Sequence, residues 1–146
     1  MVTIFTIGFA KKSLKDFAEI LDRNRVSRII DTRLRRDSQL SGFAKSRDLK
    51  YILEEILKIG YEIVPEFSPT EGLLKTYRKD KDWEKYAEGF GELIKDRKLE
   101  RFKDKLAGDK AGVCLLCSEA EADKCHRRLL AEFFCRQLPK ANIVHL

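Results

Sequence analysis

The sequence predicts an α/β fold: a single three-layer domain whose small, mostly parallel sheet of about five strands carries helices on both faces. Short apolar or β-branched runs alternate with stretches of helical periodicity five times along the chain. Right-handed crossovers between parallel strands place the intervening helices on the two faces of the sheet. At 146 residues the chain has the length of one domain, so we expect residues 1–146 to fold together.

The first half of the chain supplies three of the expected strands, which cover residues 2–7, 28–32 and 61–64. Gly8 ends the first strand, and Ser13 is placed to cap a helix with apolar residues at helical spacing. A polar loop over residues 33–45 follows the second strand. The next apolar helical stripe covers residues 49–57, with Gly60 just past the end of the expected helix.

The second half begins with a segment, residues 65–82, that contains two prolines and Gly72. We expect an excursion above the sheet there, and it is a candidate lid. The next helical pattern starts at Trp83, and Gly89 and Gly91 predict fraying or a kink in its middle. A buried strand over residues 112–116, a helix over 125–138 and a last strand over 143–146 complete the expected elements. A helix-rich fold, in which the short apolar runs are not strands, remains the alternative.

Composition and charge restrict the setting and the partners of the protein. Thirty Lys and Arg against 24 Asp and Glu give a net charge of +6, which would favour encounters with an anionic small molecule or nucleic acid. A lysine-rich solubilising surface explains the same excess. No apolar run approaches the roughly 18 residues of a membrane span, and signal-peptide features are absent. We therefore expect a cytoplasmic protein without a membrane partner and of unknown oligomeric state.

The scarcity of heat-labile residues indicates a thermophilic source. The chain has two Asn, two Gln and one Met, whereas Lys, Arg and Glu are plentiful. Ion-pair networks commonly replace heat-labile side chains in proteins from such organisms.

Polar residues follow each of the first four expected strands. In open α/β sheets, ligands bind just beyond the carboxyl ends of the strands, so these residues should converge on one edge. They are Thr6 and Gly8, then Asp31 and Arg33, then Glu66, and finally Cys117, Ser118 and Glu119. Any single position could be polar because loops are solvated, but convergence from four strands favours a functional site.

The four cysteines suggest one pair of interest. Cys114 and Cys117 have the spacing of a C-x-x-C motif, but in a strand residues three apart are about 10 Å apart and point to opposite faces. Neither a disulfide nor one zinc ion spans that separation, so Cys114 is expected in the core. Cys117 and Cys125 are the pair to test. A disulfide, a shared metal and two independent thiols remain open for them, and we favour independent thiols without a cofactor, zinc being the disfavoured alternative.

The segment Cys125-His126-Arg127 falls near the start of the last expected helix. With Asp123 as the N-cap, unpaired backbone donors and the helix dipole would surround Cys125, lower the pKa of its thiol and favour a bound anion. His126 could instead be a partly buried imidazole bonded to the sheet. Arg127 could hold a phosphate or carboxylate, or form an architectural ion pair with Asp31 or with Glu119.

The start of this helix is open, because a second capping pattern competes. Ser118 with Glu121 has the spacing of a capping box and would begin the helix earlier.

Several of these short motifs together resemble a known family. They are Thr6-Ile7-Gly8, Asp31 with Arg33, Pro65-Glu66, Leu116-Cys117-Ser118-Glu119, Cys125-His126-Arg127 and the closing Val144-His145-Leu146. In order and spacing they resemble the family called domain of unknown function 488 over nearly the whole chain, and the L-C-x-E strand end with a downstream C-H-R is the specific part. The resemblance implies a compact three-layer α/β domain with a shared polar site, and no assigned activity.

The chain departs from the pattern of that family at two places. Members often have His and Ser after the first glycine, where this chain has Phe9 and Ala10. They often have a Leu-Gly stretch after Pro-Glu, where residues 67–69 are Phe, Ser and Pro. A role that needs those groups is therefore not expected here.

The site residues favour an enzyme that acts on an anionic small molecule or a nucleic-acid component. Cys117 or Cys125 would be the nucleophile, and Glu119, Asp31 or His126 the acid and base. The anion-binding candidates are Arg33, Arg127, Thr6 and Gly8, with Glu66 as a further site residue. A cysteine-phosphatase loop is disfavoured, because the residue six beyond Cys117 is Asp123 rather than Arg.

Two other functions compete with the enzyme. One is a nucleic-acid-binding or regulatory module that uses the basic loop over residues 33–45. The other is a structural metal-binding protein, with Cys117, Cys125, His126 and Glu119 as the ligand candidates.

Overall fold

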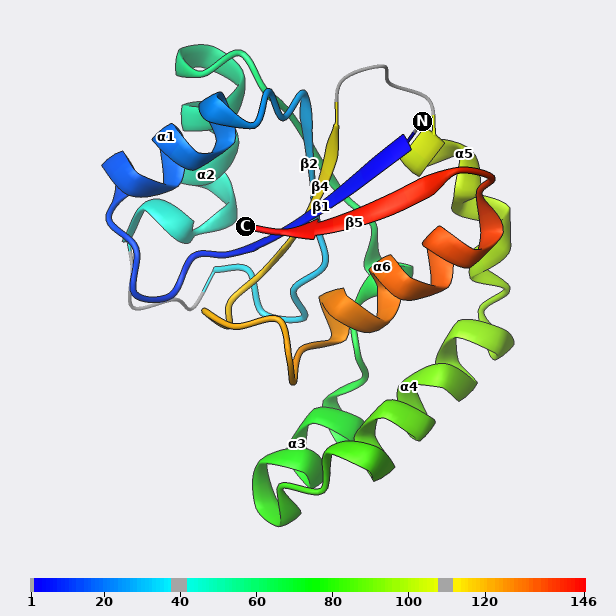
Figure 1. The fold of residues 1–146 in the computed structure, drawn as a ribbon. Helices are drawn as coiled ribbons and strands as arrows, with labels where there is room; N and C mark the ends of the chain where they lie inside the picture. The colour runs from blue at the N-terminus through cyan, green and yellow to red at the C-terminus, as the bar shows by residue number, and fades with distance from the viewer. Residues whose placement is uncertain (1, 38–41, 108–111) are drawn as a thin grey trace.

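The computed structural model describes residues 2–37, 42–107 and 112–146, and its centre is a five-stranded sheet (Figure 1). The strands are β1 (Val2–Gly8), β2 (Arg28–Asp31), β3 (Gly60–Ile63), β4 (Val113–Cys117) and β5 (Ala141–His145). Their order is β3-β2-β4-β1-β5, and every pairing is parallel. The predicted α/β class with about five strands is therefore confirmed, and the described sheet is parallel throughout.

Helices cover both faces of the sheet, which confirms the three-layer arrangement. On one face, α1 (Leu14–Arg23) and α2 (Ser46–Tyr51) pack on alternate strand residues such as Ile29 and Leu116. On the other face, α4 (Trp83–Asp96), α5 (Lys103–Ala107) and α6 (His126–Gln137) pack on the intervening residues, such as Ile30 and Leu115 (Figure 1). Two apolar cores therefore form, one on each side of the strands.

The helices on the first face begin and end for local reasons. The Ser13 hydroxyl accepts the backbone N–H of Asp16 at 3.0 Å, as the capping pattern predicted for α1. α2 continues into one π-helical turn, Ile52–Ile56, which keeps Leu53 in the core. The sequence pattern predicted this helix but not its π-helical end.

Residues 65–82 are more regular than expected. They form a 3₁₀ turn, Pro65–Phe67, and the helix α3 (Glu71–Asp80), whose first turn is capped by the Thr70 hydroxyl. Both prolines precede the first turn of α3, so neither interrupts its hydrogen bonds. Helix α3 pairs with α4, and the two extend together from the body of the molecule (Figure 1).

Helix α4 is continuous, so the expected fraying at Gly89 and Gly91 is wrong. Asp82 caps the helix by accepting the backbone N–H of Lys85. A Cβ atom at Gly89 would lie 2.7 Å from a methyl group of Leu73, so this glycine lets α3 approach α4 closely. A 3₁₀ turn, Leu99–Phe102, then leads to α5.

Among the described residues, no helix is both long and apolar enough to cross a membrane.

Candidate functional site

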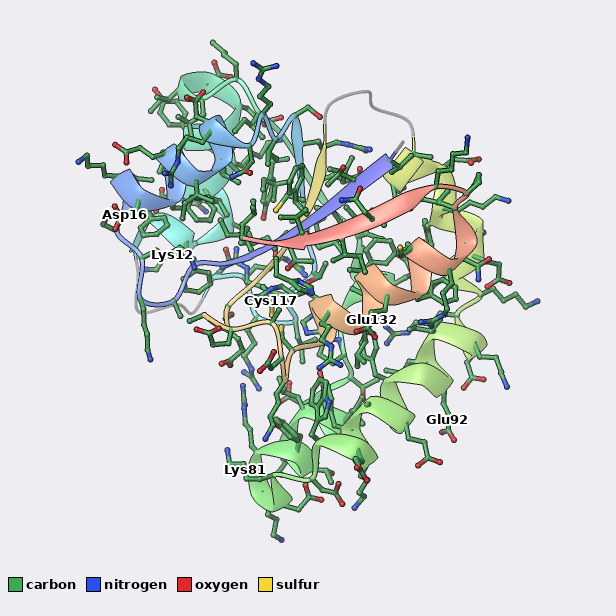
Figure 2. All side chains as sticks on the ribbon, viewed as in Figure 1. Lys12, Asp16, Lys81, Glu92, Cys117 and Glu132 are labelled. Carbon is green, nitrogen blue, oxygen red and sulfur yellow. The ribbon has the colours of Figure 1, made fainter. Side chains whose placement is uncertain are left out.

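A cavity of about 490 Å³ lies at the carboxyl ends of β2 and β4, between the strand ends and α3. Its inner wall contains Cys117, the last residue of β4, together with Cys125 and His126 at the start of α6. Residues of α3 and the loops after β2 and β4 form its other walls. In Figure 2 Cys117 lies near the centre of the molecule and Lys81 at the end of α3. The cavity is therefore at the edge where the sequence predicts a site.

A thiol–imidazole cluster forms the inner wall of the cavity. His126 Nε2 lies 2.8 Å from the backbone carbonyl oxygen of Thr32, so Nε2 carries the proton that it donates to this oxygen. His126 Nδ1 then faces the two sulfurs, 3.7 Å from Cys117 Sγ and 4.0 Å from Cys125 Sγ. All three side chains are buried. The hydrogen bond to the Thr32 carbonyl sets the tautomer and the orientation of the His126 ring.

The charges of the cluster follow from its hydrogen bonds. The pKa of the Cys117 thiol is well below its usual value, because Cys125 donates a hydrogen bond to it and His126 lies beside it, which together outweigh burial. The same hydrogen bond and burial raise the pKa of Cys125. Burial lowers the pKa of His126, but the neighbouring Cys117 thiolate outweighs that effect and raises it. These pKa directions favour a Cys117 thiolate beside a protonated Cys125 thiol and a protonated His126 ring over an uncharged cluster.

The two thiols are free but in contact, so they are not independent of each other. Cys114 behaves as expected: it is fully buried, on the opposite face of β4 from Cys117, and burial raises the pKa of its thiol.

The N-cap of helix α6 lies two residues after Asp123 and seven residues after Ser118, the two expected caps. Its N-cap is Cys125, so the expectation that Asp123 caps the helix is wrong, and the Ser118 with Glu121 alternative is wrong as well. The backbone carbonyl of Asp123 instead accepts the Arg128 guanidinium at 2.6 Å, and the Cys125 N–H bonds to the Ala122 carbonyl. Cys125 therefore lies at the helix start itself, but the expected lowering of its pKa is wrong, because its hydrogen bond to Cys117 and its burial raise that pKa.

Arg127 holds the β4–α6 loop from within. It is fully buried, and its Nη1 donates to the Glu119 carbonyl at 2.6 Å and to Cys125 Sγ at 3.6 Å. Its architectural partner is thus the loop backbone rather than the carboxylate of Asp31 or Glu119. A Cβ atom at Gly8 would lie 1.5 Å from the same Glu119 carbonyl oxygen, so only glycine allows β1 to approach this loop. Gly8 and Arg127 lie behind the cysteine loop and do not line the cavity.

Asp31 and Arg33 form a buried bidentate ion pair. Arg33 Nε and Nη2 donate to the two Asp31 carboxylate oxygens at 2.9 and 2.8 Å, and the Tyr61 hydroxyl donates to the same carboxylate. Arg33 Nη1 donates to the Ala44 carbonyl at 2.6 Å. Tyr61 and Ala44 belong to the core on the α1 and α2 side, so the Asp31 carboxylate is not brought together with the cysteines. Arg33 contributes to the cavity wall, but its charge is compensated by Asp31.

The other two residues from the strand ends also lie outside the cavity wall. Thr6 Oγ1 is 2.6 Å from His145 Nδ1 on the neighbouring strand β5. Glu66 is half-buried, and its backbone carbonyl accepts the Arg97 guanidinium at 2.9 Å.

The sequence interpretation missed the wall that α3 provides. Leu74, Tyr77, Arg78 and Lys81 line the cavity, as do Tyr86 from α4 and Lys124 from the loop before α6. The four residues of the α3 side follow the spacing i, i+3, i+4 and i+7, which places them on one helical face. That spacing was a usable signal, but the two prolines ahead of it favoured an irregular segment.

The cluster also has the composition of a metal-binding set. The sulfurs of Cys117 and Cys125 and a ring nitrogen of His126 all lie within 4.8 Å of one another. A Cys₂His set with a carbonyl-oriented imidazole could hold zinc and leave one position open to the cavity. The buried Arg127 guanidinium at Cys125 opposes this, because a second cation would lie close to it.

The fold and the site define a parallel α/β protein with a buried thiol–imidazole cluster at the carboxyl edge of its sheet. The family model described as Domain of unknown function DUF488 matches residues 13–134, and the chain belongs to that family. The matched region contains the whole cluster, and the family resemblance of the sequence motifs is confirmed. No curated protein and no solved structure gives a significant match.

Proposed function

We propose that this chain is an enzyme in which the Cys117 thiolate is the nucleophile and the substrate is an anionic small molecule or nucleic-acid component. The observation that carries this proposal is the position of His126 between the Thr32 carbonyl and Cys117 Sγ. A nucleophile beside an imidazole whose second nitrogen is oriented by a third group is the arrangement of many cysteine and serine enzymes.

The charge around the cavity supports an anionic substrate. Arg78, Lys81 and Lys124 line it and form no ion pair within the part of the chain that the structure describes. Two further arginines of the wall are each paired with a carboxylate. Glu119 is the single acidic residue among the described lining residues. The thiolate alone would repel an anionic substrate. The excess of cations around the cavity would outweigh this repulsion and attract the substrate.

The size and the apolar wall of the cavity support a small molecule. A volume of about 490 Å³ falls in the range of roughly 300–1,000 Å³ typical of small-molecule sites. Leu74, Tyr77 and Tyr86 form an apolar and aromatic wall beside the cations. A substrate with a ring or an apolar part and an anionic group fits this combination, and a nucleotide is one such molecule.

The residues of the cluster have distinct roles in the proposed reaction. Cys117 attacks the electrophilic centre of the substrate, and His126 gives its Nδ1 proton to the departing group. The Cys125 thiol stabilises the Cys117 thiolate through its hydrogen bond. Glu119, which lines the cavity, is the acid or base that serves the release of the product. Asp31 and Arg127 support the site from outside the cavity, and Arg33, paired with Asp31, forms part of the cavity wall.

The nucleic-acid-binding module receives less support from the basic loop. Arg33 is neutralised by Asp31, and Arg36 donates to the Arg33 carbonyl at 3.2 Å, so both guanidinium groups are engaged within the protein. Residues 38–41 of that loop lie outside the described residues.

Metal binding is the second candidate, favoured by the closeness of the three ligating atoms. Elemental analysis of the purified protein distinguishes the metal-binding protein from the enzyme. Stoichiometric zinc that is lost in Cys117→Ser supports the metal-binding protein, whereas free, reactive thiols support the enzyme.

Alkylation by probes of different charge tests the enzyme proposal. We expect Cys117 of the chelator-treated protein to react faster with iodoacetate than with iodoacetamide, relative to a small free thiol, by about tenfold. Arg78→Gln and Lys124→Gln should each reduce this preference. Lys79→Gln is the matched control, because Lys79 is exposed on α3 but does not line the cavity. A charge preference equal to that of the free thiol, or slow and uniform alkylation of all four cysteines, would reject the proposal.

A further inference from the structure

We infer a second activity of this cluster: the two-thiol reduction of a small hydroperoxide, in which Cys125 resolves an oxidised Cys117. The inference rests on the proposed nucleophilic role of Cys117. The two sulfurs and the His126 ring nitrogen lie within 4.8 Å of one another, and both cysteines line the same cavity. The exposed fractions of Cys117 and Cys125 are 6% and 3%. A small oxidant would therefore reach the two sulfurs through the cavity, and bulk solvent contacts them little.

Cys125 is the thiol that the fold places in reach of Cys117. Cys117 ends β4 and Cys125 is the N-cap of α6, so the seven-residue loop between them folds back and brings the two sulfurs together. Cys114 faces the opposite core, and Cys135 donates to the Ala141 carbonyl at the far end of α6. A Cys117–Cys125 disulfide then needs rotation of two side chains and a small shift of the loop.

The first step forms a sulfenic acid on Cys117. The Cys117 thiolate attacks the terminal oxygen of the hydroperoxide, an S–O bond forms and the O–O bond breaks. The departing alkoxide or hydroxide takes the Nδ1 proton of the His126 imidazolium and leaves as alcohol or water. The sulfur is oxidised by two electrons, and the peroxide is reduced by the same two electrons.

The second step forms the disulfide. The Cys125 sulfur attacks the sulfenic sulfur of Cys117, an S–S bond forms and the S–O bond breaks, with release of hydroxide. The neutral Nδ1 of His126 accepts the Cys125 proton from 4.0 Å and passes a proton to the hydroxide, which leaves as water. A dithiol reductant then returns two electrons and two protons to the pair by thiol–disulfide exchange.

Peroxide treatment followed by peptide mapping tests the inference. Trypsin cleavage after Lys110, Lys124 and Arg127 places Cys117 and Cys125 on different peptides. We expect one equivalent of hydrogen peroxide to join these peptides in the wild type and in the control Cys135→Ser, and dithiothreitol to separate them. In Cys125→Ser the bridge should be lost, and dimedone should trap a sulfenic acid on Cys117. Peroxide consumption above the rate without protein, with dithiothreitol as reductant, should be lost in Cys117→Ser.

The outcomes separate this inference from the proposed function. If Cys117 keeps its preference for iodoacetate but peroxide forms no bridge to Cys125, the two-thiol activity is wrong and the nucleophile remains. A bridge from Cys125 to Cys114, detected by fragmentation and lost in Cys114→Ala, would also overturn the inference. If Cys117 reacts with neither alkylating probe, the proposed function itself fails.

Discussion

His126 Nε2 lies 2.8 Å from the backbone carbonyl oxygen of Thr32, so a ring at the start of α6 is anchored to the end of β2. The two residues are 94 positions apart in the sequence. Because the acceptor is a backbone atom, the parallel sheet itself sets the orientation of the imidazole. His126 Nδ1 is thereby directed at Cys117, and the chemistry of the site follows from this contact.

Replacing His126 should weaken the nucleophile. In His126→Asn the imidazolium no longer stabilises the Cys117 thiolate, so burial has more weight and the pKa of Cys117 rises. We expect alkylation of Cys117 by iodoacetamide to slow by about tenfold for each unit by which the raised pKa exceeds the pH of the assay. The other histidine provides the control: His145→Asn should leave the rate unchanged, because His145 contacts Thr6 and not the thiols. Equal rates in His126→Asn and wild type would contradict this role.

The hydrogen bond from Cys125 can be tested by a pair of variants. Cys125→Ser keeps a hydroxyl donor near Cys117, whereas Cys125→Ala removes the donor. The pKa of Cys117 should therefore rise more in Cys125→Ala, since that bond is the largest cause of its low value. Thiolate absorbance in the ultraviolet, followed against pH, measures the difference. Identical titrations of the two variants would show that the bond does not determine the charge of Cys117.

A methyl group at Gly8 should disturb the cysteine loop. In Gly8→Ala the new Cβ atom meets the Glu119 carbonyl oxygen, and the loop must move, at a cost of about 1–3 kcal/mol in the free energy of unfolding. Gly91→Ala is the matched control, because no atom lies within 4 Å of a Cβ there, and a helical Ala should stabilise α4 by up to about 1 kcal/mol. Urea unfolding measures both, and equal stability of the two variants would contradict the close approach.

Breaking the buried ion pair between Asp31 and Arg33 should lower the stability of the protein and leave the pKa of Cys117 unchanged. In Asp31→Asn the buried Arg33 charge loses its partner, which should cost about 3–5 kcal/mol. Glu71→Gln removes the partner of Arg35 in an exposed pair and should cost about 1 kcal/mol or less. Because the Asp31 carboxylate faces the other core, the pKa of Cys117 in folded Asp31→Asn should equal that of the wild type. A raised pKa of Cys117 would instead make Asp31 part of the chemistry.

The sequence was sufficient for the architecture, because strand and helix periodicities alternate clearly. The Ser13 cap and the burial of Cys114 follow from local rules that tertiary contacts did not override. Helix α3 differs from the expected excursion, because the two prolines precede the helix and Gly72 lies in its first turn without breaking it. The N-cap at Cys125 was also missed, because a cysteine without a capping side-chain bond carries no capping signal.

The site was predicted in part because strand ends identify an edge but not a face. Asp31 and Cys117 both end strands at the same edge of the sheet, yet their side chains belong to opposite layers. Because side chains alternate along a strand, Asp31 shares a face of the sheet with Ile29, and Cys117 shares a face with Leu115. The face of each residue was therefore predictable in principle. The position of His126 between Thr32 and the thiols depends on long-range packing that no local pattern encodes.

The pH dependence of Cys117 alkylation in the wild-type protein tests the thiolate most directly. A group with a lowered pKa stays charged as the pH falls below its ordinary value, so the rate constant with iodoacetamide should remain level from above about 8.5, the ordinary thiol pKa, down to a far more acidic pH. It should decline only where the folded Cys117 itself becomes protonated. A rate constant that already declines through about 8.5 would show an ordinary buried thiol and would contradict the account.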